Sequence, residues 1–262
     1  MDLGIAGKRA LVLAATRGLG FGIAQALAAE GAEVILCGRD GERLAAGVRA
    51  INAAGPGNAE AIPTDLRRPA EIKALIAAVD QKFGGIDILV NNTGGPPPKA
   101  ISGVRMQEWG DQFEAMVLAP IGITTHFLPG MRQRKWGRIL TIASSGIVQP
   151  IPSLGISNAL RAALVGWSKT LAAEVARDGV TVNVMAPGRI QTDRVEETDM
   201  AAAARDNQPL DEVRRISHAQ IPVGRYGTVA EFAAAAAFLV SAHASYVTGS
   251  IVRVDGGYIR AI

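Results

Sequence analysis

Cysteine is nearly absent from this chain of 262 residues, which contains only Cys37. A single cysteine excludes an internal disulfide and is compatible with a reducing compartment. The three histidines, His126, His218 and His243, are far apart in the sequence. No group of cysteines and histidines has the spacing of a zinc site. We therefore expect no metal centre.

Long apolar runs and clustered charges are also missing. No apolar stretch reaches the roughly 18–20 residues that span a bilayer, and residues 232–240 are too few. The chain does not begin with a basic segment followed by an apolar run, so we expect no signal peptide. The net charge is +3, but the basic residues are scattered and form no stripe for nucleic acid. These features predict a cytoplasmic protein with no membrane or nucleic-acid partner.

The chain is rich in alanine and glycine, and strand-like and helix-like segments alternate along it. The predicted strands are residues 9–13, 34–37, 59–63, 86–90, 138–142, 180–185 and 251–254. The predicted helices are residues 20–30, 42–53, 69–82, 107–134, 157–177 and 230–241, with Pro120 and Pro129 interrupting the fourth. This alternation predicts a parallel sheet covered by helices on both faces. We expect one α/β domain over residues 1–262, a Rossmann-type doubly wound fold with a seven-stranded parallel sheet and three layers.

Residues 188–226 form the one long segment without a predicted strand. The segment is polar and has partly helical patterning. Long insertions of this kind often close over a binding site. We therefore expect a mobile substrate lid here.

A glycine-containing turn follows the first predicted strand and reads Ala14-Ala15-Thr16-Arg17-Gly18-Leu19-Gly20. A turn of this kind lets the backbone approach a diphosphate, and the helix that follows offers free N–H groups. Two glycines alone would also suit a structural tight turn. The position between the first strand and the first helix favours a dinucleotide site.

The end of the second predicted strand, Gly38-Arg39, indicates which dinucleotide is bound. An acidic residue there would bind the ribose hydroxyls of NAD. Gly38 has no carboxylate, whereas Arg39 can pair with a 2′-phosphate and Arg17 can approach it from the first turn. NADP is therefore favoured. The alternative is that both arginines are solvated surface charges, and the nearby Asp40 lies beyond the usual acidic position.

Several motifs together resemble those of the short-chain dehydrogenase/reductase family, near the bacterial 3-oxoacyl-acyl-carrier-protein reductases. They extend from about residue 8 to residue 257. They are Thr16-Arg17-Gly18-Leu19-Gly20, Asp65-Leu66, Asp87-Ile88-Leu89-Val90-Asn91-Asn92, Gly137-Arg138-Ile139, Pro187-Gly188 with Thr192, Tyr246-Val247-Thr248-Gly249 and Val254-Asp255-Gly256-Gly257. At Ala14 the chain departs from the family, which has a glycine there.

The resemblance implies roles for individual residues. Asp65 would bond the adenine, Asn91 would support the central strand and the cofactor, and Thr192 would contact the nicotinamide amide. The implied cofactor site comprises Ala14, Thr16, Arg17, Gly18, Leu19, Gly20, Gly38, Arg39, Asp65, Leu66, Asn91, Thr93, Gly94, Arg161, Pro187, Gly188, Ile190 and Thr192. The resemblance also implies a homotetramer, with a dimer as the alternative.

The family's chemistry uses a serine, a tyrosine, a lysine and an asparagine, and three of these four positions are altered. Ungapped flanks place Ser144 at the serine, Ser157 at the tyrosine, Arg161 at the lysine and Met116 at the asparagine. A serine hydroxyl is a much weaker acid than a phenol, whose pKa is about 10. Loss of general acid catalysis typically costs 10²–10⁴-fold, or about 3–5 kcal/mol.

A replacement acid is not evident nearby. His126 is ten positions beyond Met116, or about 15 Å along a helix, and we expect it to be a packed helix histidine. Tyr226, Tyr246 and Tyr258 lie in segments that, by resemblance, serve the lid and subunit contacts.

Three functions remain open on the sequence. The first is an NADP-dependent oxidoreductase that acts on a carbonyl or alcohol with catalytic residues Ser144, Ser157 and Arg161. The second is an NADP-binding sensor or scaffold without turnover, because the tyrosine and lysine are missing. The third is non-redox, lyase-type chemistry, for which Arg161 is suggestive but the glycine turn is not.

Overall fold

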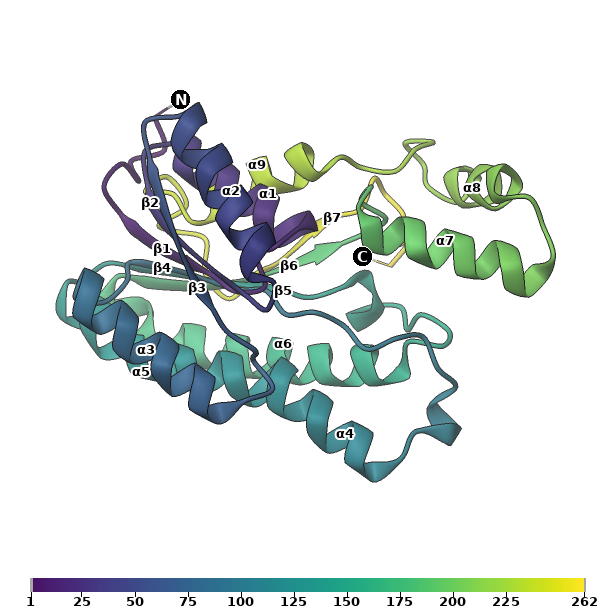
Figure 1. Ribbon diagram of the computed structural model, residues 1–262, viewed down its shortest axis with the longest axis horizontal. Helices are drawn as coiled ribbons and strands as arrows, with labels where there is room; N and C mark the ends of the chain where they lie inside the picture. Colours follow the sequence, from purple (N-terminus) through teal and green to yellow (C-terminus); the bar gives the residue numbers. More distant parts are fainter. Residues whose placement is uncertain (1, 262) are drawn as a thin grey trace.

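Seven strands form one parallel sheet in the computed structural model, which describes residues 2–261 (Figure 1). The strands are β1 (Arg9–Val12), β2 (Glu33–Gly38), β3 (Asn58–Pro63), β4 (Ile88–Asn91), β5 (Gly137–Ile142), β6 (Val180–Pro187) and β7 (Ile251–Val254). Their order is β3-β2-β1-β4-β5-β6-β7, and every neighbouring pair is parallel. The predicted Rossmann-type sheet is thus confirmed. The order reverses between β1 and β4, which is where such sheets bind ligands.

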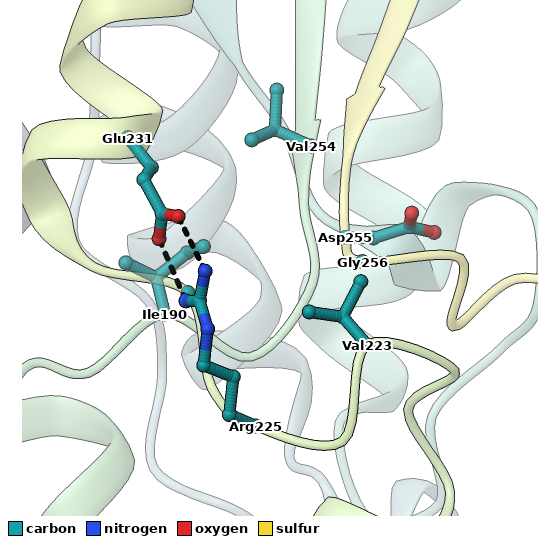
Figure 2. Close-up of a pocket in the computed structure, with 8 residues that line it drawn as sticks. Ile190, Val223, Arg225, Glu231, Val254, Asp255 and Gly256 are labelled. Atoms are coloured by element: carbon teal, nitrogen blue, oxygen red, sulfur yellow. Dashed lines mark hydrogen bonds and ion pairs between the residues drawn. The ribbon is translucent and has the colours of Figure 1, made fainter.

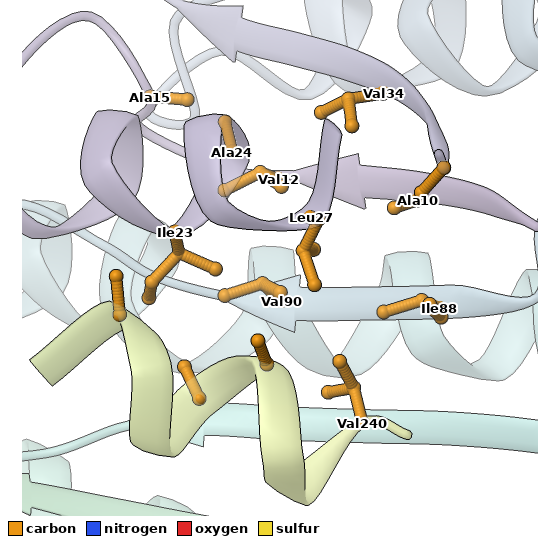
Figure 3. Close-up of a cluster of buried hydrophobic side chains, with 14 of the residues drawn as sticks. Ala10, Val12, Ala15, Ile23, Ala24, Leu27, Val34, Ile88, Val90 and Val240 are labelled. Carbon is orange, nitrogen blue, oxygen red and sulfur yellow. The ribbon is translucent and has the colours of Figure 1, made fainter. Parts of the chain in front are cut away.

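Helices cover both faces of the sheet, which gives the three predicted layers (Figure 1). One face carries α1 (Gly18–Ala29), α2 (Gly41–Ala54) and α9 (Val229–Leu239), and the other carries α3 (Pro69–Phe83), α5 (Ala119–Gln133) and α6 (Gly155–Val175). Residues of β1 alternate between the two cores because successive strand side chains point to opposite faces. Val12 packs with Leu27 of α1 (Figure 3), whereas Leu11 packs with Leu75 of α3.

The predicted helix over residues 107–134 has a different interruption from the one expected. It consists of α4 (Met106–Phe113), a π-helical turn (Glu114–Leu118) and α5, which begins at Ala119. Pro120 has no N–H to donate to the preceding turn, and the backbone widens just before it. Pro129 lies inside α5 without ending it.

The predicted lid contains two helices, α7 (Asp193–Asp206) and α8 (Leu210–Ala219). They lie beyond the end of β6, beside the main body of the sheet (Figure 1). The partly helical character of this segment is confirmed, and its mobility stays a prediction. Among residues 2–261, no helix combines the length and hydropathy that crossing a bilayer requires.

Candidate cofactor and active site

The start of α1 fits a diphosphate. Arg17 occupies the N-cap position but its side chain makes no capping hydrogen bond, so the first N–H groups of α1 are free to bind an anion. A Cβ at Gly20 would lie 2.6 Å from the Ala14 carbonyl oxygen and equally close to Nδ2 of Asn92. Nδ2 of Asn92 donates to the Leu13 and Ala14 carbonyls, both at 3.2 Å. The turn is therefore tightly held against the end of β4.

Ala14 keeps the backbone conformation expected of the family's glycine. Its φ is +47°, in the left-handed region that L-residues with a side chain avoid. That conformation costs about 1–2 kcal/mol in a residue other than glycine. Alanine at this position therefore adds strain that glycine would not have.

The end of β2 explains why an acidic residue is absent. A Cβ at Gly38 would lie 2.5 Å from Cγ2 of Thr16, so even alanine would require a shift. The neighbouring arginines line a shallow polar cleft of about 520 Å³. Its lining residues are Thr16, Arg17, Arg39, Asp40, Arg43 and Glu197. Arg43 was missed by the sequence analysis, although α2 begins just after Asp40 and a helix brings the third residue back beside its cap.

Two acidic residues of α7 pair with Arg17. Its Nη1 lies 3.0 Å from Oδ2 of Asp193 and 3.0 Å from Oε1 of Glu197. The hydrogen bonds that Arg17 donates to these carboxylates raise the pKa of Arg17. The guanidinium predicted to hold a phosphate is thus bonded to the lid helix.

Asp65 has a partner within the chain. Nη2 of Arg67 lies 2.5 Å from its Oδ2, and this hydrogen bond holds the pKa of Asp65 below its usual range. Leu66, beside it, is buried. The adenine contact of Asp65 stays a prediction.

The residues at the end of β4 have unsatisfied polar atoms. Nδ2 of Asn91 donates to Oγ1 of Thr124 at 3.1 Å. Oδ1 of Asn91 and Oγ1 of Thr93 are buried and have no hydrogen-bond partner in the described part of the chain. Leaving such atoms unpaired costs about 1–3 kcal/mol each. Both are available to a bound group.

Ser157 and Arg161 lie one helical turn apart on α6, and both are buried. Nε of Arg161 donates to Oγ of Ser157 at 3.2 Å. Nη1 of Arg161 donates to the Ile142 carbonyl at 2.7 Å, and Nη2 reaches the Gly94 and Thr93 carbonyls at 3.3 and 3.4 Å. The arginine therefore links α6 to the ends of β4 and β5.

Ser144 lies two residues after the end of β5 and is only partly buried. Its Oγ accepts a hydrogen bond of 3.1 Å from the Gly146 N–H. The neighbouring Ser145 is buried. Ser144 is therefore the more accessible hydroxyl at this strand end.

The positive charge of Arg161 has no counterion nearby. No carboxylate hydrogen-bonds to its guanidinium among residues 2–261. Burial, and then the charge of Arg194, lower the pKa of Arg161 to about 10. The side chain remains a cation at neutral pH, where it can stabilise negative charge.

Met116 occupies the position at which the family has an asparagine, and its surroundings are apolar. It lies in the π-helical turn, is 1% exposed and packs with Ile156 and Leu160 of α6. A thioether in an apolar cluster cannot hold a water for proton transfer. This side of the site therefore offers no relay like the family's.

The end of β6 brings the predicted nicotinamide-side residues to the glycine turn. Pro187 ends the strand, and a Cβ at Gly188 would lie 2.6 Å from Cα of Asp255. Oγ1 of Thr192 caps α7, and its Cγ2 would be 3.6 Å from a Cβ at Gly18. Ile190 is buried. Residues far apart in the sequence thus converge at the ends of the strands.

The prediction that His126 is packed was wrong. Its side chain is 42% exposed, and Nε2 lies 2.7 Å from Oδ2 of Asp80 on α3. The ring sits on the solvent side of α5, where it is within hydrogen-bond distance of a carboxylate on a neighbouring helix. Tyr226, in the lid, donates to Oδ2 of Asp199 at 2.9 Å. Neither side chain hydrogen-bonds to Ser144, Ser157 or Arg161.

A second cavity, of about 170 Å³, lies between the lid and the end of β7 (Figure 2). Arg225 and Glu231 on its wall pair with each other, with an N–O distance of 2.6 Å. Asp255 accepts hydrogen bonds from the N–H groups of Gly257 and Ile259. The charged groups of this cavity are satisfied internally, so we assign it no ligand.

Comparisons with known proteins identify similar reductases. A family model described as enoyl-(acyl carrier protein) reductase matches residues 13–259. The chain is 37% identical over 257 residues to a 3-oxoacyl-(acyl-carrier-protein) reductase of Vibrio cholerae serotype O1, covering 97% of this chain and 98% of the relative. It is 38% identical over 253 residues to the reductase of the same name from Escherichia coli K12, covering 96% and 97%.

A solved structure is similar over the whole length. L-sorbose reductase from Gluconobacter frateurii, complexed with NADPH and L-sorbose, matches with a TM-score of 0.95 and 33% identity, covering 100% of both chains.

Proposed function

The chain belongs to the short-chain dehydrogenase/reductase family of oxidoreductases, and from this premise we propose that it is an NADPH-dependent reductase of a carbonyl compound. In this proposal Ser144, Ser157 and Arg161 act where the family has serine, tyrosine and lysine. The observation that carries it is the hydrogen bond from buried Arg161 to Ser157, next to the strand end that bears Ser144.

Three features support NADP as the cofactor. The start of α1 has free N–H groups for a diphosphate. Gly38 leaves no room for the acidic residue that would favour NAD. Arg17, Arg39 and Arg43 line one cleft, where a 2′-phosphate would be held by charge-assisted hydrogen bonds. The similar L-sorbose reductase is itself complexed with NADPH.

NADPH, when bound, supplies the hydride. The chain's own residues then have to manage the negative charge that develops on the substrate oxygen. Ser144 and Ser157 offer hydroxyl donors. Ser157 already accepts a hydrogen bond from Arg161, so its own proton is free to point toward the substrate. The cation next to it makes that hydroxyl a stronger hydrogen-bond donor and stabilises the oxyanion.

Such a site is weaker than one with a phenol. A serine hydroxyl lacks a pKa near the working pH, so the serine would polarise the oxygen more than protonate it. Turnover should then be slower by about 10²–10⁴-fold than with a full general acid. Residues 188–226 would close over the substrate, and α7 would carry Thr192 toward the nicotinamide.

A homotetramer, or a dimer, fits the exposed apolar residues at the sheet edge. Tyr246 is fully exposed and Ile251 of edge strand β7 is 46% exposed. An unpaired edge strand favours pairing with a second copy.

The test is NADPH oxidation by the purified protein with a panel of aliphatic, aromatic and polyhydroxylated ketones, together with calorimetric titration of NADPH and NADH. We expect tighter binding of NADPH and slow turnover of at least one ketone. Binding without any turnover would contradict the enzyme and leave the NADP-binding sensor. Absence of heat with both coenzymes would contradict both functions.

One observation supports the alternative function of an NADP-binding sensor. Met116 and Ser157 stand where the family has two groups of its proton pathway. The double change Ser157→Tyr with Arg161→Lys separates the two functions. A sensor would gain turnover where it had none, whereas the enzyme proposed above turns over without the change.

A further inference from the structure

We propose that Arg161 and Arg194 together recognise an anionic group of the substrate, a carboxylate. The inference rests on the proposed function, because it names the substrate class of that same site. It assigns a specificity role to Arg194, a residue of the lid helix α7 that lies outside the predicted cofactor site.

The two arginines hold the same short loop. Nη2 of Arg161 reaches the carbonyl oxygens of Thr93 and Gly94 at 3.4 and 3.3 Å. Nη2 of Arg194 donates to the carbonyl oxygen of Pro96 at 2.7 Å. Two guanidinium groups from different parts of the chain, one on α6 and one on α7, thus converge on residues 93–96.

Neither cation has a carboxylate partner in the described part of the chain. Other arginines of the lid do: Arg189 pairs with Asp199, Arg205 with Asp206 and Arg214 with Glu196. The carbonyls that Arg161 and Arg194 bond are neutral, so no carboxylate of the described chain compensates either charge. Arg161 is buried, whereas Arg194 is exposed on the lid helix and can turn toward a ligand.

Both guanidinium groups reach the same short loop, so their positive charges repel each other without an anion. The charge of Arg194 adds to burial in lowering the pKa of Arg161. A buried charge such as that of Arg161 is normally paired. Arg161 already donates to Ser157 and to three carbonyl oxygens, whereas Arg194 bonds only the Pro96 carbonyl and keeps N–H donors for a planar carboxylate. An anion between the two groups would convert a repulsion into two attractions.

Burial alone does not carry the argument, as Arg138 illustrates. It is 3% exposed and also bonds only carbonyl oxygens, including that of Ser241 at 2.9 Å. Its guanidinium, however, stacks on the ring of Trp136 at 4.5 Å. Burial is the only cause that lowers the pKa of Arg138, and no second cation contributes. Arg161 therefore differs from Arg138 in having a second cation, Arg194, nearby.

The anion could in principle belong to the cofactor or to the substrate. The cofactor phosphates are already assigned to other binding groups in the proposed function. These are the start of α1 and the cleft with Arg17, Arg39 and Arg43. Arg194 comes two residues after Thr192, at the predicted nicotinamide end, where the substrate must meet the hydride. We therefore assign the anion to the substrate, and the test separates the two sources.

The first arm of the test compares keto acids with their neutral methyl esters. Pyruvate, acetoacetate and levulinate vary the spacing between carbonyl and carboxylate. We expect kcat/KM for the best acid to exceed that of its ester, and Arg194→Gln to reduce the acid-to-ester ratio by about 10–100-fold. Arg205→Gln is the matched control on the same helix, because its charge pairs with Asp206 in solvent, and it should leave the ratio unchanged.

The second arm measures binding without turnover. Levulinate is titrated calorimetrically into the protein saturated with NADP⁺, and NADP⁺ is titrated separately. We expect Arg194→Gln to weaken the binding of levulinate by about 10-fold or more. The affinity for NADP⁺ should stay close to that of the unaltered protein. Weakening of NADP⁺ alone would assign the anion to the cofactor and overturn the inference.

The two proposals fail separately. Equal turnover of acids and esters, unaffected by Arg194→Gln, would overturn the carboxylate site and leave the reductase. Levulinate binding that depends on Arg194, without turnover of any ketone, would overturn the reductase and leave the anion site.

Discussion

Arg161 donates a hydrogen bond to Ser157 from one turn farther along α6, at a distance of 3.2 Å. The contact follows from the i, i+4 spacing that places two side chains on the same helix face. It makes the serine an acceptor toward the arginine and leaves its proton free. The same arginine donates to carbonyl oxygens at the ends of two strands. These contacts fix the arginine, and its hydrogen bond in turn fixes the position of Ser157.

Ser157→Ala should lower kcat by about 10²–10³-fold, because the substrate oxygen loses a donor that Arg161 polarises. NADPH affinity should change little, since the residues proposed to bind the cofactor phosphates lie elsewhere. Stopped-flow and calorimetric measurements check the two quantities. Thr170→Ala removes an exposed hydroxyl from the same helix and should have no effect on kcat. Equal rates for Ser157→Ala and the unaltered protein would remove Ser157 from the mechanism.

Arg39→Ala should weaken the binding of NADPH by about 10–100-fold and leave the binding of NADH nearly unchanged. The loss corresponds to about 1.5–3 kcal/mol for a charge-assisted hydrogen bond to the 2′-phosphate. Calorimetric dissociation constants for both coenzymes provide the measurement. Arg68→Ala is the control, because Arg68 is exposed and pairs with Glu71. A parallel loss for NADH would show that Arg39 does not read the extra phosphate.

Asp193→Asn combined with Glu197→Gln should increase the affinity for NADPH by about 2–10-fold. The two carboxylates occupy Arg17, and exposed ion pairs of this kind are each worth about 0–1 kcal/mol. The gain should shrink at high salt because these charges are screened. Glu196→Gln on the same helix, which pairs with Arg214, should leave affinity unaltered. Weaker NADPH binding by the double variant would mean that the acids help to hold the cofactor.

Ala14→Gly should raise the free energy of unfolding by about 0.5–1 kcal/mol. Glycine removes the strain of φ +47°, and greater freedom of the unfolded chain offsets part of that gain. Urea denaturation measures the change. Ala15→Gly is the adjacent comparison, because Ala15 is fully buried and should lose stability when its methyl group is removed. Destabilisation by both changes would contradict the strain argument.

Asp87→Asn should lower the free energy of unfolding by about 1–3 kcal/mol at pH 7. Asp87 is buried between Arg9 and Arg134, whose guanidinium groups are partly exposed and therefore screened. Burial alone raises the pKa of Asp87, but the hydrogen bonds and charge of Arg9, with the charge of Arg134, outweigh it and lower the pKa.

The pH dependence follows from that lowered pKa. The stability contributed by Asp87 is present above the unfolded pKa of about 4 and is lost as pH falls through the lower folded value. The difference between the unaltered protein and Asp87→Asn should therefore shrink between about pH 5 and pH 2. Asp206→Asn, which breaks an exposed pair with Arg205, should alter stability little. A difference that stays constant over this range would contradict the linkage.

The sequence predicted the sheet because apolar runs and glycine-containing turns are local signals. Gly38 and Arg39 were predicted as cofactor residues because they follow the second strand, and the contact of Ser157 with Arg161 is a matter of helical spacing. The ion pairs of Arg17 with Asp193 and Glu197 were not predictable, since 176 and 180 residues separate the partners. Their approach depends on how α7 is placed, and periodicity does not specify that.

His126 was assigned wrongly for a related reason. A single histidine on a helix with apolar residues on several sides could lie on either face, and only the position of α3 with Asp80 decides it. The carbonyl partners of Arg161 come from two different strand ends and from no motif. Sequence spacing indicated which side chains are candidates for the chemistry, whereas tertiary packing determined the partners of those side chains.

The first turn of α7 contacts two separate parts of the chain. Asp193 pairs with Arg17 after β1, and the next residue, Arg194, donates to the Pro96 carbonyl after β4. If a phosphate bound to Arg17 displaced Asp193 and moved this turn, it would also move Arg194. The two binding events would then share one free energy of coupling, and each ligand would change the affinity of the other by an equal factor.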